Sequence, residues 1–482
     1  MVVYAPSQLL PALTAFVTTP ILTRLFPPAE FGFWAMASSI AAFMVAIAVS
    51  GFGSAVIRFL PSYKIKSTLR IFFATIINSV NVTITIVVIA SYIIFFLFKS
   101  LLPPEIIQVF NLIILIFVFQ SIFNIFIAVL RANGQIGSFT TFQLLSNYGG
   151  LAFGLLFVVV FRMRIDGLLW GTILSLFLIL PLLIIKATNR IGVHLKDFQL
   201  PDAKQIWQYA WPLTLGNVAM WGLRVSDLFI INLFRSDREV GLYSVSYNIS
   251  AKSIELLVSL FLLSVSPLVY RTWESEGREA TEKTLTMISR VYLLLCLPAT
   301  LGLTILAFPF VALLTTPDYY EGTKIVGFVV FSSFAWGLSN IAVLGIAIKK
   351  KALLLAATQI LAVSVHVGLQ FLLVPRFGYV ASAISTLIGY TVLLGVQTIS
   401  SHPYLTWRFP FKTFRNVLSS SLVMGLFIWG YYGIVNKTTP IYLFISILFA
   451  IPVYIACLWL FGEITQSEKK SLIQLCAKLR KA

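Results

Sequence analysis

Long apolar stretches, each able to cross a lipid bilayer, occupy most of this sequence of 482 residues. Hydrophobic residues make up 59% of the chain and charged residues 11%, a composition that excludes a soluble globular protein. A hydrocarbon core about 30 Å thick needs roughly 20 apolar residues per helix. We therefore predict an all-α polytopic membrane protein with about 14 transmembrane helices. The expected ranges are 3–25, 31–57, 70–98, 106–130, 138–161, 166–187, 205–233, 240–270, 284–314, 322–348, 352–374, 379–400, 414–435 and 439–461.

The net charge of +18 comes from lysine and arginine residues that gather on one side of these predicted helices. With the N-terminus inside, inward loops and tail hold 23 of the 35 and outward loops hold 9. The positive-inside rule then predicts a multi-pass membrane protein with both termini inside. The same rule explains the basic charge, so we expect no nucleic-acid partner. Met1 leads into the first apolar stretch without a basic segment, so we expect no cleaved signal peptide.

The chain contains an internal repeat. Residues 25–34 and 233–243 each carry an acidic residue two positions before a glycine and an aromatic residue two positions after it. The two glycines, Gly32 and Gly241, are 209 positions apart, and a second pair, Gly167 and Gly378, are 211 apart. These nearly equal offsets predict two six-helix bundles of the same orientation, related by an axis along the membrane normal.

The repeat divides the chain into five expected parts. Residues 1–190 form the first bundle, 191–204 a cytoplasmic connector and 205–402 the second bundle. Residues 403–461 supply two further helices outside the repeat, and 462–482 form a cytoplasmic tail that we expect to be an amphipathic helix on the anionic inner leaflet.

Four ionisable residues lie inside the predicted seventh and eighth helices: Arg224, Asp227, Lys252 and Glu255. A charge near the bilayer centre costs about 2.5–3.5 kcal/mol or more, so it normally faces a partner or a watery cavity. Four of them in neighbouring helices predict a polar chamber, which is typical of a transporter.

Two asparagines extend this pattern. Asn217 is seven residues before Arg224 and shares its helix face, and Asn248 lies on one polar stripe with Lys252 and Glu255. Arginine suits a phosphate group because its planar fork donates two parallel hydrogen bonds. We therefore expect these cations and amides to bind an anionic headgroup.

The carboxylates of Asp227 and Glu255 have two interpretations. In the first, one of them binds and releases H⁺ or Na⁺ and couples this ion to transport. In the second, Arg224 pairs with Asp227, and Lys252 with Glu255, merely to cancel charge within each helix.

Other polar residues carry weaker signals. Arg24 and Arg58 lie near helix ends, where they either add to the cationic site or extend to the membrane surface. His366 is either an interhelical hydrogen-bonding residue or a proton relay. Uncharged residues that either bind sugars or hydrogen-bond neighbouring helices are Gln8, Gln120, Asn124, Gln143 and Asn147.

No pattern of catalysis stands out. The three cysteines, Cys296, Cys457 and Cys476, are scattered without metal-ligand spacing, and no Ser/His/Asp set or phosphate-binding glycine loop is present in the sequence. We expect neither an enzyme nor a cofactor or metal.

Two segments of the first helices resemble a known family. Residues 20–34 read Pro-Ile-Leu-Thr-Arg-Leu-Phe-Pro-Pro-Ala-Glu-Phe-Gly-Phe-Trp, and residues 51–61 read Gly-Phe-Gly-Ser-Ala-Val-Ile-Arg-Phe-Leu-Pro. They are similar to the opening of the polysaccharide-biosynthesis exporters, the Wzx-type O-antigen flippases. Their superfamily also contains the MATE drug exporters and the lipid II flippases.

The resemblance implies two bundles that alternate between inward-open and outward-open states. It also implies a substrate of oligosaccharide on undecaprenyl diphosphate, moved to the outer leaflet of the plasma membrane (the bacterial inner membrane). Polysaccharide polymerase and assembly proteins are the expected partners. One alternative is a MATE-like cation-coupled drug or metabolite antiporter, but the carboxylate that MATE exporters often carry in the first helix is missing from 3–25. A second alternative, a polysaccharide polymerase or glycosyltransferase, is disfavoured by the short outward loops.

Overall fold

The computed structural model describes residues 5–101, 104–189, 191, 195–349, 351–435 and 440–463, and within them it contains helices and no strand. The α-helices are α1 (Ala5–Leu25), α2 (Pro28–Ile65), α3 (Leu69–Phe98), α4 (Pro104–Ala132), α5 (Ile136–Val159), α6 (Asp166–Thr188), α7 (Leu200–Phe234), α8 (Asp237–Ile305), α9 (Ala307–Leu314), α10 (Thr323–Ala342), α11 (Leu344–Ile348), α12 (Ala352–Phe377), α13 (Tyr379–Ser401), α14 (Phe411–Val435) and α15 (Pro440–Leu460). Three short 3-10 helices are η1 (Lys99–Leu101), η2 (Leu195–Asp197) and η3 (Pro317–Gly322).

The all-helical membrane fold is confirmed. Each of the fourteen predicted ranges overlaps a helix, and ten helices in the described part of the chain are long and apolar enough to span a membrane. The eighth and ninth predicted spans are joined as α8, which turns back at Gly277. Gly277 adopts a φ of 79°, a value that glycine tolerates best because it has no Cβ.

The predicted connector is shorter than expected, because α7 already begins at Leu200. Pro201 lies in the first turn, where its missing N–H costs nothing, and Asp202 complements the helix dipole there. These starting residues are polar, so hydropathy alone places the beginning of α7 too late. The predicted tail, 462–482, lies outside the described residues beyond Glu463.

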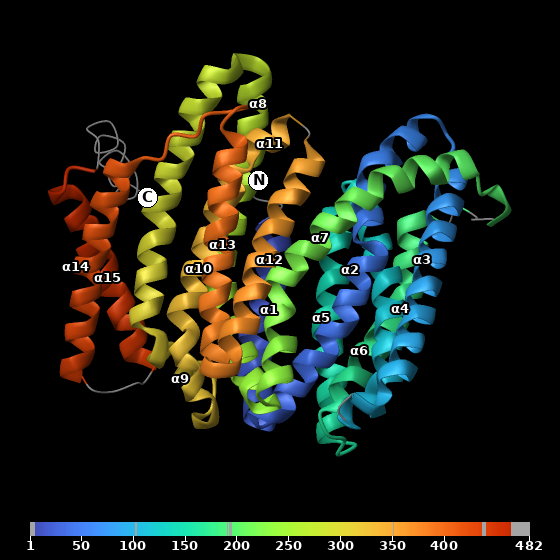
Figure 1. Ribbon diagram of the computed structural model, residues 1–482, viewed down its shortest axis with the longest axis horizontal. Helices are drawn as coiled ribbons and strands as arrows, with labels where there is room; N and C mark the ends of the chain where they lie inside the picture. Colours follow the sequence, from blue (N-terminus) through green and yellow to red (C-terminus); the bar gives the residue numbers. More distant parts are fainter. Residues whose placement is uncertain are drawn as a thin grey trace, which may run out of the picture.

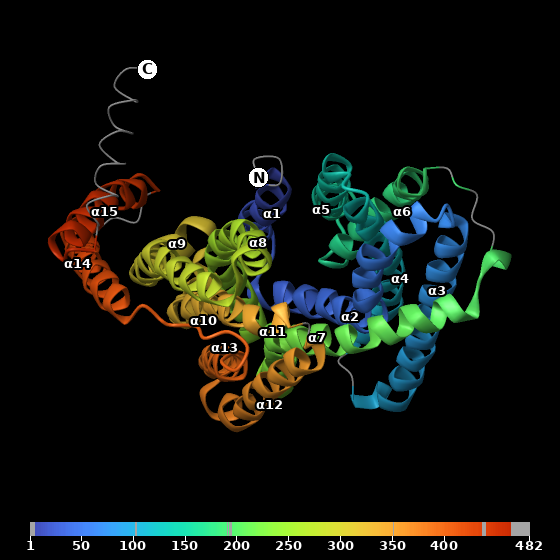
Figure 2. The same ribbon diagram turned by 90° about the horizontal axis from the view of Figure 1, so that it is seen from above.

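The helices form one elongated array (Figure 1). Helices α2 to α6 lie at one end of the long axis, α14 and α15 lie at the other, and α8 to α13 lie between them (Figures 1 and 2). The two halves exchange contacts, because α1 packs on α8 and α7 packs on α2. At the bottom of the molecule in Figure 1, α1 joins α2 and α7 joins α8, and we call this region the lower end.

At the lower end, the repeated glycines bring α2 and α8 into backbone contact. A Cβ added at Gly32 would collide with the carbonyl oxygen of Asp237, and a Cβ added at Gly241 would collide with that of Pro28. The contact is therefore reciprocal, as twofold-related halves require. Nearby, Tyr319 donates a 2.8 Å hydrogen bond to the Phe26 carbonyl, which joins the halves again.

The acidic residues of the repeat have equivalent positions in their own halves. Glu30 forms a 3.1 Å ion pair with Arg164, which lies two residues before α6. Glu239 accepts a 3.0 Å hydrogen bond from the backbone N–H of Tyr379, the first residue of α13. Each carboxylate thus ties the start of the second helix of its half to the start of the sixth.

The last two helices are fastened to α8. The Arg290 Nε donates to Glu463 Oε1 at 2.9 Å, and this buried carboxylate also accepts hydrogen bonds from Thr413 and Asn416 of α14. The Tyr454 hydroxyl of α15 donates to the Leu294 carbonyl at 2.9 Å.

The glycine crossing gives the first prediction. Gly241→Ala should disfavour the closed lower end by about 1–3 kcal/mol, because the added methyl group meets a backbone carbonyl that cannot move aside. Thr23→Cys, placed at this buried junction in a background without native cysteines, reports the opening. When Gly241→Ala is present, we expect maleimide to label the cysteine at position 23 roughly 5–150-fold faster, which is the factor that corresponds to this change in free energy.

Gly368→Ala on α12 is the matched control, since a Cβ there meets no atom within 4 Å. It should leave the labelling rate unchanged. Equal rates for both variants would show that the crossing does not hold the lower end closed.

Candidate functional site: a cationic cavity between the halves

A cavity of about 290 Å³ lies where α2, α7 and α8 meet. Its polar lining consists mainly of hydroxyls from α2, one cation from α7 and a polar stripe from α8: Ser38, Ser39, Arg224, Asn248, Lys252 and Glu255. Four of the six residues predicted from the seventh and eighth helices are therefore brought together here.

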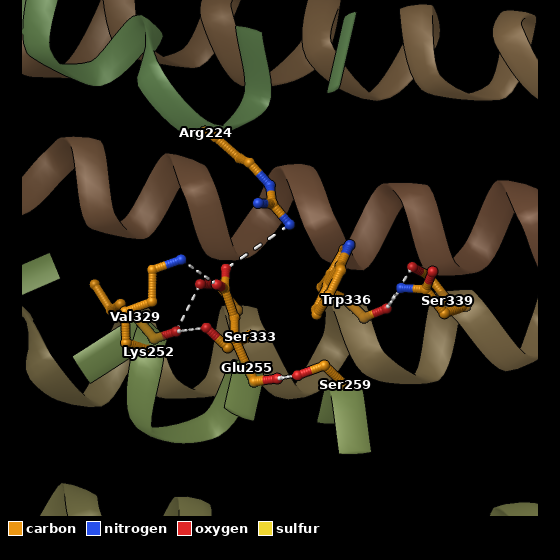
Figure 3. A network of polar contacts seen from close by, with 10 residues as sticks. Arg224, Lys252, Glu255, Ser259, Val329, Ser333, Trp336 and Ser339 are labelled. Carbon is orange, nitrogen blue, oxygen red and sulfur yellow. Dashed lines mark hydrogen bonds and ion pairs between the residues drawn. The ribbon is translucent and has the colours of Figure 1, made fainter. Parts of the chain in front are cut away.

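Glu255 lies between the two cations (Figure 3). Its carboxylate accepts from Lys252 Nζ at 2.9 Å and lies 3.8 Å from Arg224 Nη2. The Arg224 guanidinium also lies 5.1 Å from the ring centroid of Trp336, a cation–π contact. The carboxylate thus links α7 to α8 and also neutralises part of the cationic charge.

The charge of this triad is not balanced. Two cations share one carboxylate, so the triad carries one excess positive charge. The Arg224 and Lys252 side chains are 37% and 38% exposed, whereas the Glu255 side chain is 17% exposed. The cations are therefore the accessible groups, and the cavity can attract an anion without first breaking a fully buried pair.

Asp227 lies apart from this cavity and is completely buried in the second half. Its carboxylate accepts hydrogen bonds from Gln370 of α12 and Thr386 of α13, and His366 Nε2 lies 3.7 Å away. Asp227 lies only about 60° around α7 from Arg224, but its carboxylate contacts α12 and α13 whereas Arg224 contacts Glu255 of α8. Of the two pairings in the second interpretation, the described part of the chain has that of Lys252 with Glu255 and lacks that of Arg224 with Asp227.

The other three predicted residues are not in the cavity. Asn217 shares the face of Arg224 but lies about 10 Å further along α7, and its side chain is exposed. Arg24 is exposed at the end of α1 and donates to the Pro20 carbonyl at 2.9 Å. Arg58 is exposed on α2. Both arginines are positioned as membrane-surface residues would be.

Sequence reasoning missed the aromatic and hydroxyl groups of the site. Trp336 contributes the ring over Arg224 from α10, and Trp34 lines the cavity from α2. In the sequence, Trp34 stands out only as the aromatic residue two positions after Gly32 in the repeat. Gln370 could have been found from the sequence, because it lies one helical turn after His366 on the same apolar helix.

Comparison with known proteins concerns the family and the fold of the chain. The family described as "Polysaccharide biosynthesis protein" matches residues 21–324. This range is more than half of the chain, and the chain therefore belongs to this family, as the opening motifs predicted.

A relative and two solved structures extend the comparison. "Probable low-salt glycan biosynthesis flippase Agl15" of Haloferax volcanii is 20% identical over 60% of this chain, and the match spans 61% of that protein's length. The structure "Lipid II flippase MurJ, inward closed conformation" has a TM-score of 0.76 at 17% identity and covers 96% of this chain and 99% of its own. An inward-facing MATE family multidrug transporter of the MOP superfamily has a TM-score of 0.63 at 14% identity, covering 83% of this chain and 97% of its own. The structural likenesses establish a shared fold.

The shared carboxylate gives the second prediction. Glu255→Gln should lower the free energy of unfolding by about 1–3 kcal/mol, because it leaves two cations facing each other. This loss is smaller than the 3–5 kcal/mol typical of a fully buried pair, since both cations are partly solvated. Lys252→Gln should cost less, because the Arg224 contact with Glu255 remains. Thermal unfolding of the detergent-purified protein measures both.

Glu279→Gln serves as the control, because the ion pair of Glu279 with Lys283 is largely exposed and should contribute little. If Glu255→Gln unfolds at the same temperature as Glu279→Gln, the triad does not balance charge in the folded protein.

Proposed function

We propose that this protein is a flippase for lipid-linked oligosaccharide. Its substrate is an O-antigen or other surface-polysaccharide repeat unit on undecaprenyl diphosphate, moved from the inner to the outer leaflet of the plasma membrane. The observation that carries the proposal is the cavity with one excess positive charge at the junction of the halves. Membership of the polysaccharide biosynthesis family and the flippase names of its relatives support it.

The physical task is to carry a hydrated diphosphate past about 30 Å of hydrocarbon. Moving one ion-sized charge into a medium of low dielectric costs on the order of 20 kcal/mol in the idealised Born limit. Unit charges 4 Å apart attract by about 4 kcal/mol at an effective dielectric of 20. Two cations close to two phosphates therefore offset part of this cost, while the prenyl chain remains in lipid.

Glu255 makes this binding reversible. When no substrate is bound, Glu255 forms an ion pair with Lys252 and contacts Arg224, so both cations have a partner. An incoming diphosphate competes for the same groups and weakens the link between α7 and α8. Substrate binding would thereby favour a different arrangement of the halves, as alternating access requires.

The positive-inside pattern assigns the lower end to the outer face, with both termini in the cytoplasm. The glycine crossing and the Tyr319 hydrogen bond then close the outward path in this conformation. In this orientation, the cationic cavity receives its substrate from the inner leaflet.

Ion coupling belongs to the same proposal. Asp227 accepts hydrogen bonds within the second half and lies one turn from Arg224 on α7, so an H⁺ or Na⁺ bound there would act through the position of α7. Glu255 offers a direct electrostatic route, because an anion beside it raises its affinity for a cation.

The cations give the third prediction. In a strain lacking the gene, Arg224→Ala or Lys252→Ala should restore less than about a tenth of surface polysaccharide, because each removes charge from the diphosphate site. Arg224→Lys should restore an intermediate amount, since lysine keeps the charge and loses the fork. Surface polysaccharide and the protein level in the membrane are measured together.

The location of unexported repeat units separates the candidate functions. The deletion strain should accumulate single repeat units that face the cytoplasm. Normal polysaccharide with raised drug sensitivity would instead indicate an antiporter, and single units facing outward would indicate a polymerase. Full export by both alanine variants would contradict the cationic site.

Coupling gives the fourth prediction. In proteoliposomes, an imposed pH or Na⁺ gradient should accelerate transport by the wild type, and Asp227→Asn or Glu255→Gln should abolish this dependence, because each removes a carboxylate that binds the ion. Rates that ignore both gradients in all three proteins would leave the carboxylates with a structural role alone.

A further inference from the structure

A second cavity adjoins the cationic one within the first half. It has a volume of about 380 Å³ and lies between α2, α4 and α6. Ser38 of α2 lines both cavities, so the two are neighbours along one face of this helix. The polar side chains of the second cavity are Gln120 and Asn124 of α4, Thr172 of α6 and Ser38 itself.

The two carboxamides have no hydrogen-bond partner among the residues that the structure describes. Within the described chain, no hydrogen bond joins the side chain of Gln120 or Asn124 to another residue, although both are partly buried. Thr172 donates to the Leu168 carbonyl of its own helix at 3.0 Å and keeps its acceptor capacity. A polar group in a membrane helix normally bonds to a neighbouring helix, because an unpaired amide costs free energy there. These amides therefore do not act as links between helices.

The lining of this cavity suits a neutral ligand rich in hydroxyl groups. No charged side chain lines it, and each carboxamide offers both donors and an acceptor. On the α2 side the wall is built of small residues, among them Ala42 and Ala46, which leave space between the helices. From Ser38 to Ala46, α2 rises about 12 Å. Together with the cationic cavity, the space falls within the roughly 300–1,000 Å³ of ligand pockets.

We propose that Gln120 and Asn124 form the glycan subsite, which binds hydroxyl groups of the sugars next to the diphosphate. This inference rests on the proposed flippase function. The two halves then divide the headgroup between them: Arg224 and Lys252 of the second half bind the diphosphate, and the amides of the first half select the sugar.

The test measures binding of two lipids to purified protein in detergent. One is farnesyl diphosphate, which has no sugar, and the other is the lipid-linked glycan fraction extracted from cells that lack the gene. The variant Gln120→Met with Asn124→Leu should bind the glycan lipid about tenfold more weakly than the wild type, from the loss of two hydrogen bonds. Its affinity for farnesyl diphosphate should be unchanged.

Two further variants test whether the loss of binding is specific to this cavity. Ala42→Leu fills the cavity without removing a polar group and should give the same selective loss, which keeps the test valid if the double variant fails to fold. Gln143→Met, on α5 and outside both cavities, should bind both lipids as the wild type does.

Each outcome separates the two proposals. Equal loss of both lipids, or an unchanged affinity for the glycan lipid in the double variant and in Ala42→Leu, would overturn the glycan subsite. Arg224→Ala should weaken both lipids, because both carry the diphosphate. A wild-type protein that binds neither lipid would overturn the flippase proposal and this inference with it.

Discussion

The approach of two helix backbones at Gly32 and Gly241 determines how the rest of this molecule is arranged. With no side chain between them, α2 and α8 cross closely enough for each glycine to face a carbonyl of the other helix. The crossing places the first helix of each half against the second helix of the other. The polar faces of α2, α7 and α8 converge above it, and there they enclose the cationic cavity.

The carboxylates of Asp227 on α7 and Glu255 on α8 lie in different environments. Glu255 contacts two cations and leaves one positive charge in excess, while the Asp227 carboxylate accepts hydrogen bonds from Gln370 and Thr386. All charged residues that line the two described cavities come from the second half. A single helix, α7, therefore carries a partly exposed cation that contacts α8 and α10 and, one turn later, a buried carboxylate that contacts α12 and α13.

Much of the fold was predictable, because apolar length and charge at the helix ends are written into the sequence. The repeat also marked Gly32 and Gly241 as equivalent residues, although their contact with each other's helix came only from the structure. The part of the site that charge inside apolar helices marks was predictable: Asn248, Lys252 and Glu255 form a stripe on α8 and share the cavity with Arg224 of α7. Partners across helices were not predictable, because Trp336 over Arg224 and Gln370 beside Asp227 depend on how α10 and α12 pack. Asn217 was wrongly assigned to the site because the prediction used only the angle around α7, which it shares with Arg224. It did not use the distance of about 10 Å along the helix axis.

The reciprocal crossing has a consequence for how such a chain can evolve. A contact in which each half presents the same patch is isologous, as in a homodimer with C2 symmetry. In a homodimer, every substitution appears twice, so a cation on one side of the cavity must be matched by the same cation on the other. A fused chain escapes this constraint. One half can acquire the Arg224, Lys252 and Glu255 triad while the other keeps neutral amides, and a ligand with two chemically different ends then has only one way to enter.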